Sequence, residues 1–130
     1  MQIAGVEVYV NHPVLHLGAT DWPPVLELGD APAASCDTHV AVRVRPQSGL
    51  IRVRLFQDHG DPVSADPAFT TVFDGRLRLD DGRLAIGDVE GHTRFVRRLG
   101  DRGTWQVRIA VDTPGRDARA IDVTVARTGT

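Results

Sequence analysis

The 130-residue chain has a single cysteine, no lysine and no long apolar run. One thiol, Cys36, excludes a disulfide framework within the chain, and a reducing compartment is the simplest environment for it. Because no stretch approaches the ~18 apolar residues of a membrane-spanning helix, we expect no transmembrane segment. The first residues carry no basic cluster and Glu7 interrupts their apolar pattern, so we expect no signal peptide, no membrane partner and a cytoplasmic location.

Strong positive charge is also missing. The formal net charge is −2, whereas general binders of nucleic acid or membrane surfaces are strongly basic, so neither partner is expected. All 15 basic residues are arginine. Two interpretations of this bias stay open: the codon usage of a high-GC genome, or selection for the bidentate anion recognition that arginine performs and lysine does not.

The sequence contains no G-x-S-x-G, H-E-x-x-H, C-x-x-C or phosphate-loop motif. His12 and His16 have the spacing of two ligands on a helix, but on an extended chain they lie too far apart for one metal ion. We therefore interpret them as ordinary surface or turn histidines. The sequence predicts a non-enzymatic protein with no catalytic residues, no metal and no cofactor.

Apolar and polar residues alternate with period two along most of the chain, which is typical of half-buried strands. We expect strands at 3–10, 14–17, 36–45, 50–56, 68–73, 76–80, 83–89, 94–99, 105–111 and 121–125, a further short one at 25–28, and a loop at 29–35. The chain is thus predicted to be an all-β, two-layer antiparallel β-sandwich of about eight to ten short strands. We expect a single domain over residues 1–130, and a small β-barrel is the alternative architecture.

Turn chemistry predicts two hairpins. The segments 40–45 and 50–56 flank a four-residue turn, which would place Arg43 directly opposite Arg52. Asp81-Gly82 is a preferred two-residue type I′ turn, which would pair 76–80 with 83–89 and bring opposite charges and apolar residues together across the strands.

The C-terminal half contains GRLRL at 75–79, DGRLAIGD at 81–88 and GTWQVRI at 103–109. This pattern resembles a broad group of small β-sandwich proteins common in actinobacteria and is weakly similar to the competence protein J family. The resemblance covers roughly residues 70–126 and implies a sandwich fold. Because the founding role of that family is inhibition of a DNA-entry nuclease, it also implies a binding role as an inhibitor or immunity-type partner. Members usually carry Pro-Gly and then Tyr or Phe where this chain has DRGTW at 101–105, and the family offers no catalytic residues to transfer.

The arginines of the first predicted hairpin are the main candidate site. If Val42 and Val44 face the core, the guanidinium groups face solvent, and like charges opposite each other destabilise a sheet unless anions lie nearby. Those anions are either the protein's own, on Glu7, Glu90, Asp112 or Asp122, or those of an external acidic partner, such as the carboxylates of another protein or a phosphate chain. Trp22, beside two prolines, is either part of a binding edge or a plug at one end of the sandwich. The candidate binding residues are Arg43, Arg45, Arg52, Arg54 and Trp22.

Two alternatives accompany this hypothesis. Asp58, His59 and Asp61 place two carboxylates around an imidazole, a pattern that would suit a small enzyme or a ligand or metal carrier, although the same residue types are favoured by ordinary turns. The strand at 3–10 has few charges or prolines to protect its edge, so it would allow a homodimer by edge pairing.

Overall fold

The computed structural model describes residues 2–10, 13–21, 26–44, 49–58, 66–88, 94–113 and 118–127, which contain ten strands and no helix. The strands are β1 (Gln2–Val10), β2 (Val14–Gly18), β3 (Ala33–Ser35), β4 (His39–Arg43), β5 (Gly49–Asp58), β6 (Thr70–Leu79), β7 (Arg83–Asp88), β8 (Arg94–Arg98), β9 (Gly103–Val111) and β10 (Ala120–Arg127). The prediction of an all-β chain is confirmed. In this part of the chain, no helix suited to crossing a membrane is found.

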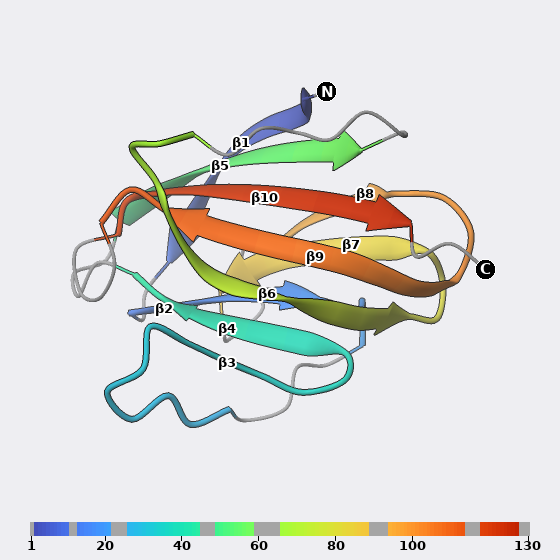
Figure 1. Ribbon diagram of the computed structural model, residues 1–130, viewed down its shortest axis with the longest axis horizontal. Helices are drawn as coiled ribbons and strands as arrows, with labels where there is room; N and C mark the ends of the chain where they lie inside the picture. The colour runs from blue at the N-terminus through green and yellow to red at the C-terminus, as the bar shows by residue number, and fades with distance from the viewer. Residues whose placement is uncertain are drawn as a thin grey trace.

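The strands form two five-stranded sheets that enclose one apolar core (Figure 1). The first sheet has the order β1-β5-β10-β9-β6, and the second has the order β3-β4-β2-β7-β8. Neighbouring strands are antiparallel, except that β5 and β10 run parallel. The predicted sandwich is confirmed over the barrel, because the described strands form two open sheets.

Alternate residues of both sheets fill the space between the layers, as expected when two sheets pack face to face. Val40 and Val42 of β4 are fully buried, and so are Ile51, Val53 and Leu55 of β5. The prediction that these alternate aliphatic side chains of the two segments face the core is therefore confirmed. The described arginines of these segments, Arg43, Arg52 and Arg54, consequently lie on the solvent side of their sheets.

The predicted hairpin between 40–45 and 50–56 is wrong. β4 lies in the second sheet between β3 and β2, whereas β5 lies in the first sheet between β1 and β10. Arg43 is therefore beside Val14 of β2, and Arg52 lies between β1 and β10, far from the predicted partner. Alternation does not distinguish the two arrangements, because a chain that crosses between layers buries the same residues as one that folds back within a layer.

The predicted type I′ hairpin at Asp81-Gly82 is also wrong, since β6 pairs with β9 while β7 pairs with β2 and β8. The amide of Gly82 donates to the carbonyl of Leu79 at 3.1 Å, which closes a turn with Asp80 and Asp81 in its centre. Gly82 has a φ of +68°, but no described non-glycine residue has a positive φ, so Asp81 does not adopt the type I′ conformation. This turn carries the chain from the first sheet to the second.

Some strand boundaries differ from expectation. The strands expected at 68–73 and 76–80 are one continuous strand, β6, with a bulge between Thr71 and Phe73. The loop expected at 29–35 ends in the short strand β3, which pairs with β4, and the strand expected from residue 36 begins at His39. Of the short strand expected at 25–28, residues 26–28 have no regular structure.

Candidate interaction surface

The pairing of β1 with β5 gathers four exposed side chains at the edge of the first sheet. Tyr9 lies directly opposite Leu50, and Glu7 lies directly opposite Arg52. Because Glu7 and Tyr9 are two residues apart on one strand, and Leu50 and Arg52 on the other, all four point to the same face. We call Glu7, Tyr9, Leu50 and Arg52 the β1–β5 patch.

The β1–β5 patch combines apolar exposure with a charged group. Tyr9 is 43% exposed and Leu50 is 51% exposed, and among the described residues Val96 is the one other large apolar side chain with comparable exposure. Tyrosine and arginine are enriched in the residues that dominate binding energy at protein interfaces. Since β1 has no strand on its outer side in the described part of the chain, the patch borders an open sheet edge.

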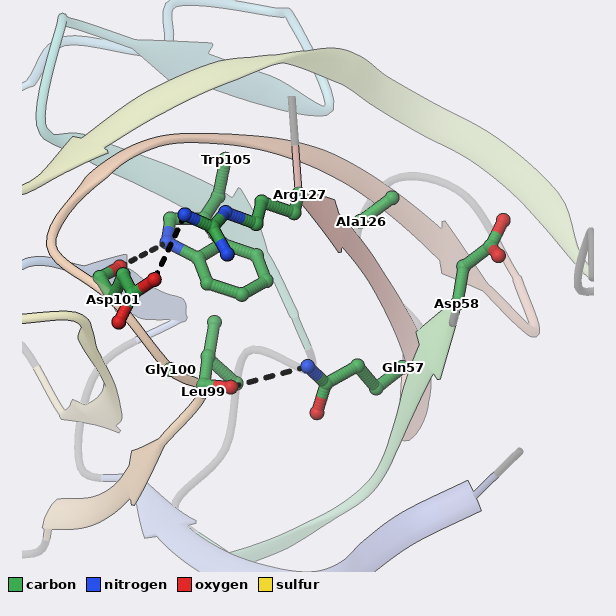
Figure 2. A pocket seen from close by; sticks show the side chains of 8 residues that line it. All are labelled: Gln57, Asp58, Leu99, Gly100, Asp101, Trp105, Ala126 and Arg127. Atoms are coloured by element: carbon green, nitrogen blue, oxygen red, sulfur yellow. Dashed lines mark hydrogen bonds and ion pairs between the residues drawn. The ribbon is translucent and has the colours of Figure 1, made fainter. Parts of the chain in front are cut away.

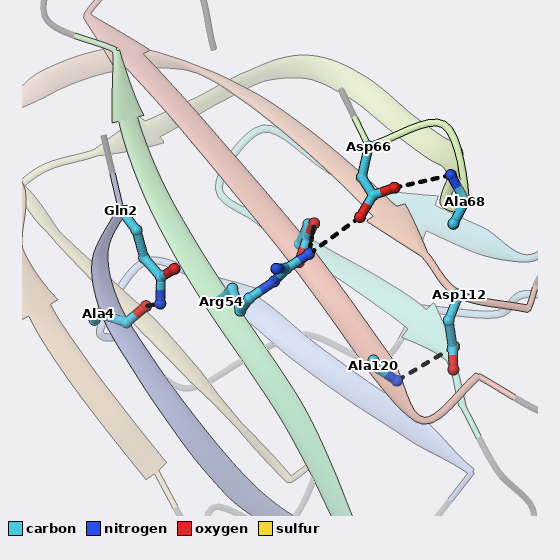
Figure 3. A network of polar contacts seen from close by, with 8 residues as sticks. Gln2, Ala4, Arg54, Asp66, Ala68, Asp112 and Ala120 are labelled. Atoms are coloured by element: carbon cyan, nitrogen blue, oxygen red, sulfur yellow. Dashed lines mark hydrogen bonds and ion pairs between the residues drawn. The ribbon is translucent and has the colours of Figure 1, made fainter. Parts of the chain in front are cut away.

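Arg54 is held by the protein's own carboxylates. It lies opposite Asp122 of β10, and its Nε and Nη2 atoms donate to the two carboxylate oxygens of Asp122 at 2.7 and 2.6 Å. Figure 3 shows the same guanidinium pointing toward Asp66, whose carboxylate lies 3.6 Å from Nη2. The bonds from Asp122, together with the charge of Asp66, raise the pKa of Arg54 above its ordinary value. Arg54 is therefore a structural ion-pair residue.

Two aromatic rings complete the surroundings of Arg54. Its guanidinium carbon lies 5.6 Å from the centroid of Phe56 and 5.4 Å from that of Phe69, distances at which a cation is attracted to the face of a ring. Arg54 thus connects β5, β10 and the turn that begins at Asp66. In this network, the guanidinium of Arg54 helps to hold neighbouring parts of the first sheet together.

Arg52, two residues earlier on the same strand, has a different environment. Its side chain is exposed, and within the described ranges no hydrogen bond or ion pair to its guanidinium is found. Of the carboxylates considered from the sequence, Glu7 faces Arg52 across the strands. Asp112 instead accepts the main-chain amides of Arg119, at 3.0 Å, and of Ala120, at 3.2 Å; Figure 3 shows the second of these bonds. Glu90 lies outside the described residues. Arg52 is accordingly available for an external anion.

The remaining predicted binding residues do not join the patch. Arg43 lies in the second sheet, where its Nε donates to the carbonyl of Ala31 at 3.4 Å and its Nη2 donates to the carbonyl of Gly29. Arg43 therefore fastens the segment before β3 to β4. Arg45 and Trp22 lie outside the described residues.

Of the alternative loop site, Asp58 is the last residue of β5 and lines a pocket at one end of the sandwich, while His59 and Asp61 lie outside the described residues. Figure 2 shows that the indole of Trp105 and the pair of Arg127 with Asp101 also line this pocket. The indole N–H donates to the carbonyl of Asp101 at 3.1 Å, and Arg127 lies 2.8 Å from the Asp101 carboxylate. In the ranges that the structure describes, no group of three or more potential metal ligands is found.

Sequence reasoning missed a second pocket, which His16, His39, Asp88 and Arg94 line together. The interpretation of His16 as a surface or turn histidine is correct only in part, because His16 lies in the strand expected at 14–17 and is half-buried, and its Nδ1 atom is buried with no hydrogen-bond partner among the described residues. Burial, and then repulsion by His39, lower the pKa of His16, and the carboxylate of Asp88 partly opposes this effect. The alternation of His16 with Leu15 and Leu17 was the one signal of its position in a strand.

The β1–β5 patch was found only in part from the sequence. Arg52 was a candidate, but Tyr9 and Leu50 were not, because their pairing depends on β1 lying beside β5. A tyrosine and a leucine 41 positions apart carry no joint signal in a single sequence.

Comparisons with known proteins give similarity of fold. No family model matches the sequence, and no curated protein matches it. Among solved structures, ComJ from Bacillus subtilis, an inhibitor of the DNA degrading activity of NucA, superposes with a TM-score of 0.68 over 98% of this chain and 98% of its own, at 15% identity. The crocagin biosynthetic gene J product superposes with a TM-score of 0.62 over 98% of this chain and all of its own, at 12% identity. This chain has the fold of both proteins.

Proposed function

We propose that this protein is a non-enzymatic binding module that inhibits another protein, and that the β1–β5 patch makes the contact. The observation that carries the proposal is the exposed pair of Tyr9 and Leu50 beside Arg52, whose guanidinium holds no carboxylate within the described ranges. Burying the two apolar side chains would contribute about 25 cal/mol for each Å² of apolar surface removed from water. A bidentate carboxylate on the partner would satisfy Arg52 and set the orientation.

The partner that fits this surface is a protein with an apolar area facing Tyr9 and Leu50 and a carboxylate facing Arg52. The fold shared with ComJ, which is described as an inhibitor of a DNA-degrading activity, supports a nuclease as the class of partner. That support is an analogy of fold, and the patch supplies the physical argument. Inhibition follows if the bound module covers the active site or the DNA path of the enzyme.

The test is capture of a partner by the purified protein, followed by an activity assay. Tagged wild-type protein and the variants Arg52→Ser and Tyr9→Ser are incubated with an extract of the source organism, and captured proteins are identified by mass spectrometry. We expect wild-type protein to retain a nuclease, and each variant to bind it about tenfold more weakly or worse, a loss of ~1.4 kcal/mol in binding free energy. The isolated nuclease should then lose DNA cleavage in proportion to added wild-type protein.

Arg76→Ser is the matched control, because Arg76 is an exposed arginine on β6 at the opposite edge of the same sheet. It should bind and inhibit as the wild type does, and circular dichroism should show that all variants are folded. If Arg52→Ser and Tyr9→Ser retain the nuclease as well as the control does, or if the captured enzyme stays fully active, the proposed function is wrong.

The open edge beside the patch supports a second proposal, a homodimer, which sedimentation tests. β1 leaves one side of the first sheet unpaired in the described part of the chain, so two copies could join edge to edge through this strand. A homodimer of this kind would sediment at twice the monomer mass at high concentration. A monomer under those conditions removes the homodimer and leaves the heterologous partner.

A further inference from the structure

A different edge of the molecule has the features of a peptide-binding strand. β8 is the last strand of the second sheet and pairs with β7 alone in the described part of the chain. The amide of Leu99 donates to the carbonyl of Gly82 at 2.9 Å, which continues the β7–β8 ladder beyond β8. Because antiparallel strands turn the main-chain groups of every second residue toward the partner, Phe95 and Arg97 face β7 as Leu99 faces Gly82.

The intervening residues of β8 face the other way. The N–H and C=O groups of Arg94, Val96 and Arg98 consequently point away from β7 toward the open edge, where no described strand pairs with them. The side chains of these three residues are all exposed, and Val96 is 37% exposed. The edge therefore offers main-chain donors and acceptors flanked by a regular row of arginine, valine and arginine.

The charges of this row are not balanced by the protein's own described carboxylates. Arg98 lies directly opposite Arg83 of β7, and Arg83 is already paired with Asp81 at 3.0 Å. Arg94 uses its Nη1 atom to donate to the carbonyl of Thr20 at 2.9 Å, and no carboxylate within the described ranges lies within ion-pair distance of Arg94 or Arg98. Like charges on neighbouring strands destabilise a sheet, so an anion placed here would relieve the repulsion.

A second copy of this chain does not fit the edge. If two β8 strands paired antiparallel about Val96, Arg94 of each copy would lie opposite Arg98 of the other, which adds two repulsive pairs. The charge pattern thus disfavours self-pairing in this register and favours an acidic segment of another protein.

We propose that the open edge of β8 binds an extended acidic segment of a partner protein, which adds as a sixth strand to the second sheet. Main-chain hydrogen bonds from Arg94, Val96 and Arg98 supply affinity, and alternate side chains supply specificity, as in other cases of strand addition. The row of arginine, valine and arginine selects a segment with acidic residues four positions apart and an apolar residue midway between them. This site uses different residues from the β1–β5 patch and does not depend on the function proposed for that patch.

Arginines on an edge strand can also be explained without a ligand, and the experiment must distinguish that explanation from peptide binding. Charged side chains on an edge strand protect it from aggregation, and this role requires no ligand. Protection predicts that removal of the arginines causes self-association, whereas a binding site predicts sequence-dependent capture of a peptide. Sedimentation of the variants measures self-association, and peptide titration measures binding, so the two explanations can be distinguished.

The probe is a labelled peptide of sequence TTETVTETT, titrated against the full chain in low salt and followed by fluorescence anisotropy and by amide chemical shifts. We expect saturable binding with the largest shifts at Arg94, Val96 and Arg98. A peptide of the same composition with the two glutamates three positions apart, so that they point to opposite faces, should bind at least tenfold more weakly. Equal binding of both peptides, or shifts confined to other strands, would overturn the proposal.

Two pairs of variants make the test independent of any one substitution. Arg98→Glu should weaken binding of the acidic peptide at least tenfold and favour the same peptide with lysine replacing one of the two glutamates, because Arg94 still pairs with the other, while Arg76→Glu on β6 should do neither. Val96→Pro removes the central outward N–H, and proline is tolerated on an edge strand where that group faces solvent, so the fold should persist while affinity falls at least tenfold relative to Val96→Thr. If Val96→Pro binds as Val96→Thr does, strand addition is wrong; if Arg52→Ser changes peptide affinity, the site is not separate from the β1–β5 patch.

Discussion

Arg54 of β5 and Asp122 of β10 lie directly opposite each other on the parallel pair of strands and share two hydrogen bonds, of 2.7 and 2.6 Å. The sequence left two sources open for the anions near these arginines, the protein's own carboxylates or an external partner. For Arg54, this bidentate pair shows that the protein's own carboxylate is the anion. The anion of Arg54 belongs to the protein, whereas Arg52, two residues away on the same face, faces solvent. Neighbouring arginines of one strand therefore differ in role, and the substitutions below separate them.

Arg54→Ser should lower the free energy of unfolding, because it removes both bonds to Asp122 and leaves that carboxylate, which is 12% exposed, without its cation. The guanidinium is 37% exposed, and partial screening by solvent limits the loss to about 1 kcal/mol. Chemical denaturation measures the change. Arg52→Ser is the control and should leave stability within about 0.5 kcal/mol of the wild type. Equal stability of the two variants would contradict the assignment of Arg54 to cohesion.

Gly82→Ala should destabilise the protein more than Gly29→Ala. Both glycines have φ in the left-handed region, at +68° and +58°, which costs a non-glycine residue about 1–2 kcal/mol. A Cβ at Gly29 meets open space, whereas a Cβ at Gly82 meets the main-chain carbonyl of Gly100, which cannot move independently of the β8–β9 connection. Thermal unfolding of both variants isolates the steric part as their difference. A similar melting temperature for the two would show that the close approach to Gly100 is unimportant.

His16 should make the protein less stable in mild acid. Burial, with the added repulsion of His39, lowers the pKa of His16 below its ordinary value of 6.5. The unfolded chain then binds more protons at this group than the folded chain does, so its contribution to stability is complete above pH ~6.5 and is lost as the pH falls toward the folded-state pKa. Melting temperatures from pH 7.5 to 5.5 measure this loss. His16→Gln should flatten the profile in that interval, and an unchanged slope would show that other groups cause it.

Asp81 should contribute stability that disappears at lower pH. Its Oδ2 accepts the hydroxyl of Thr20 at 2.6 Å, and this bond, together with those from Arg83, lowers the pKa of the carboxyl. For a carboxyl with a lowered folded pKa, the stabilisation is present above the ordinary carboxyl pKa of ~4 and is lost as the pH falls through the folded value. Thr20→Val should reduce the free energy of unfolding at pH 7 by about 1 kcal/mol and weaken the acid dependence. Equal acid unfolding curves for this variant and the wild type would contradict the assignment.

Much of the site could not be predicted from the sequence, because it depends on which strands are neighbours. Arg52 was selected because it alternates with Ile51 and Val53, and that alternation correctly placed it on the solvent side. Its supposed neighbour, Arg43, proved to lie in the other sheet, because a four-residue connection serves equally well to fold back within a layer or to cross to the next one. The β8 edge was missed for the same reason, since an edge is a property of strand order.

The sequence by itself determined which residues face the core and that the chain is built of strands, because side-chain direction alternates along any strand whatever its partners. Strand order, and with it the meeting of Tyr9 with Leu50, of Arg54 with Asp122 and of Arg98 with Arg83, was decided only by the tertiary structure. Main-chain hydrogen bonds are the same for every pair of strands, so the choice among partners comes from how both layers pack at once. The choice of strand partners therefore depends on all the strands together and cannot be read from any one segment of the sequence.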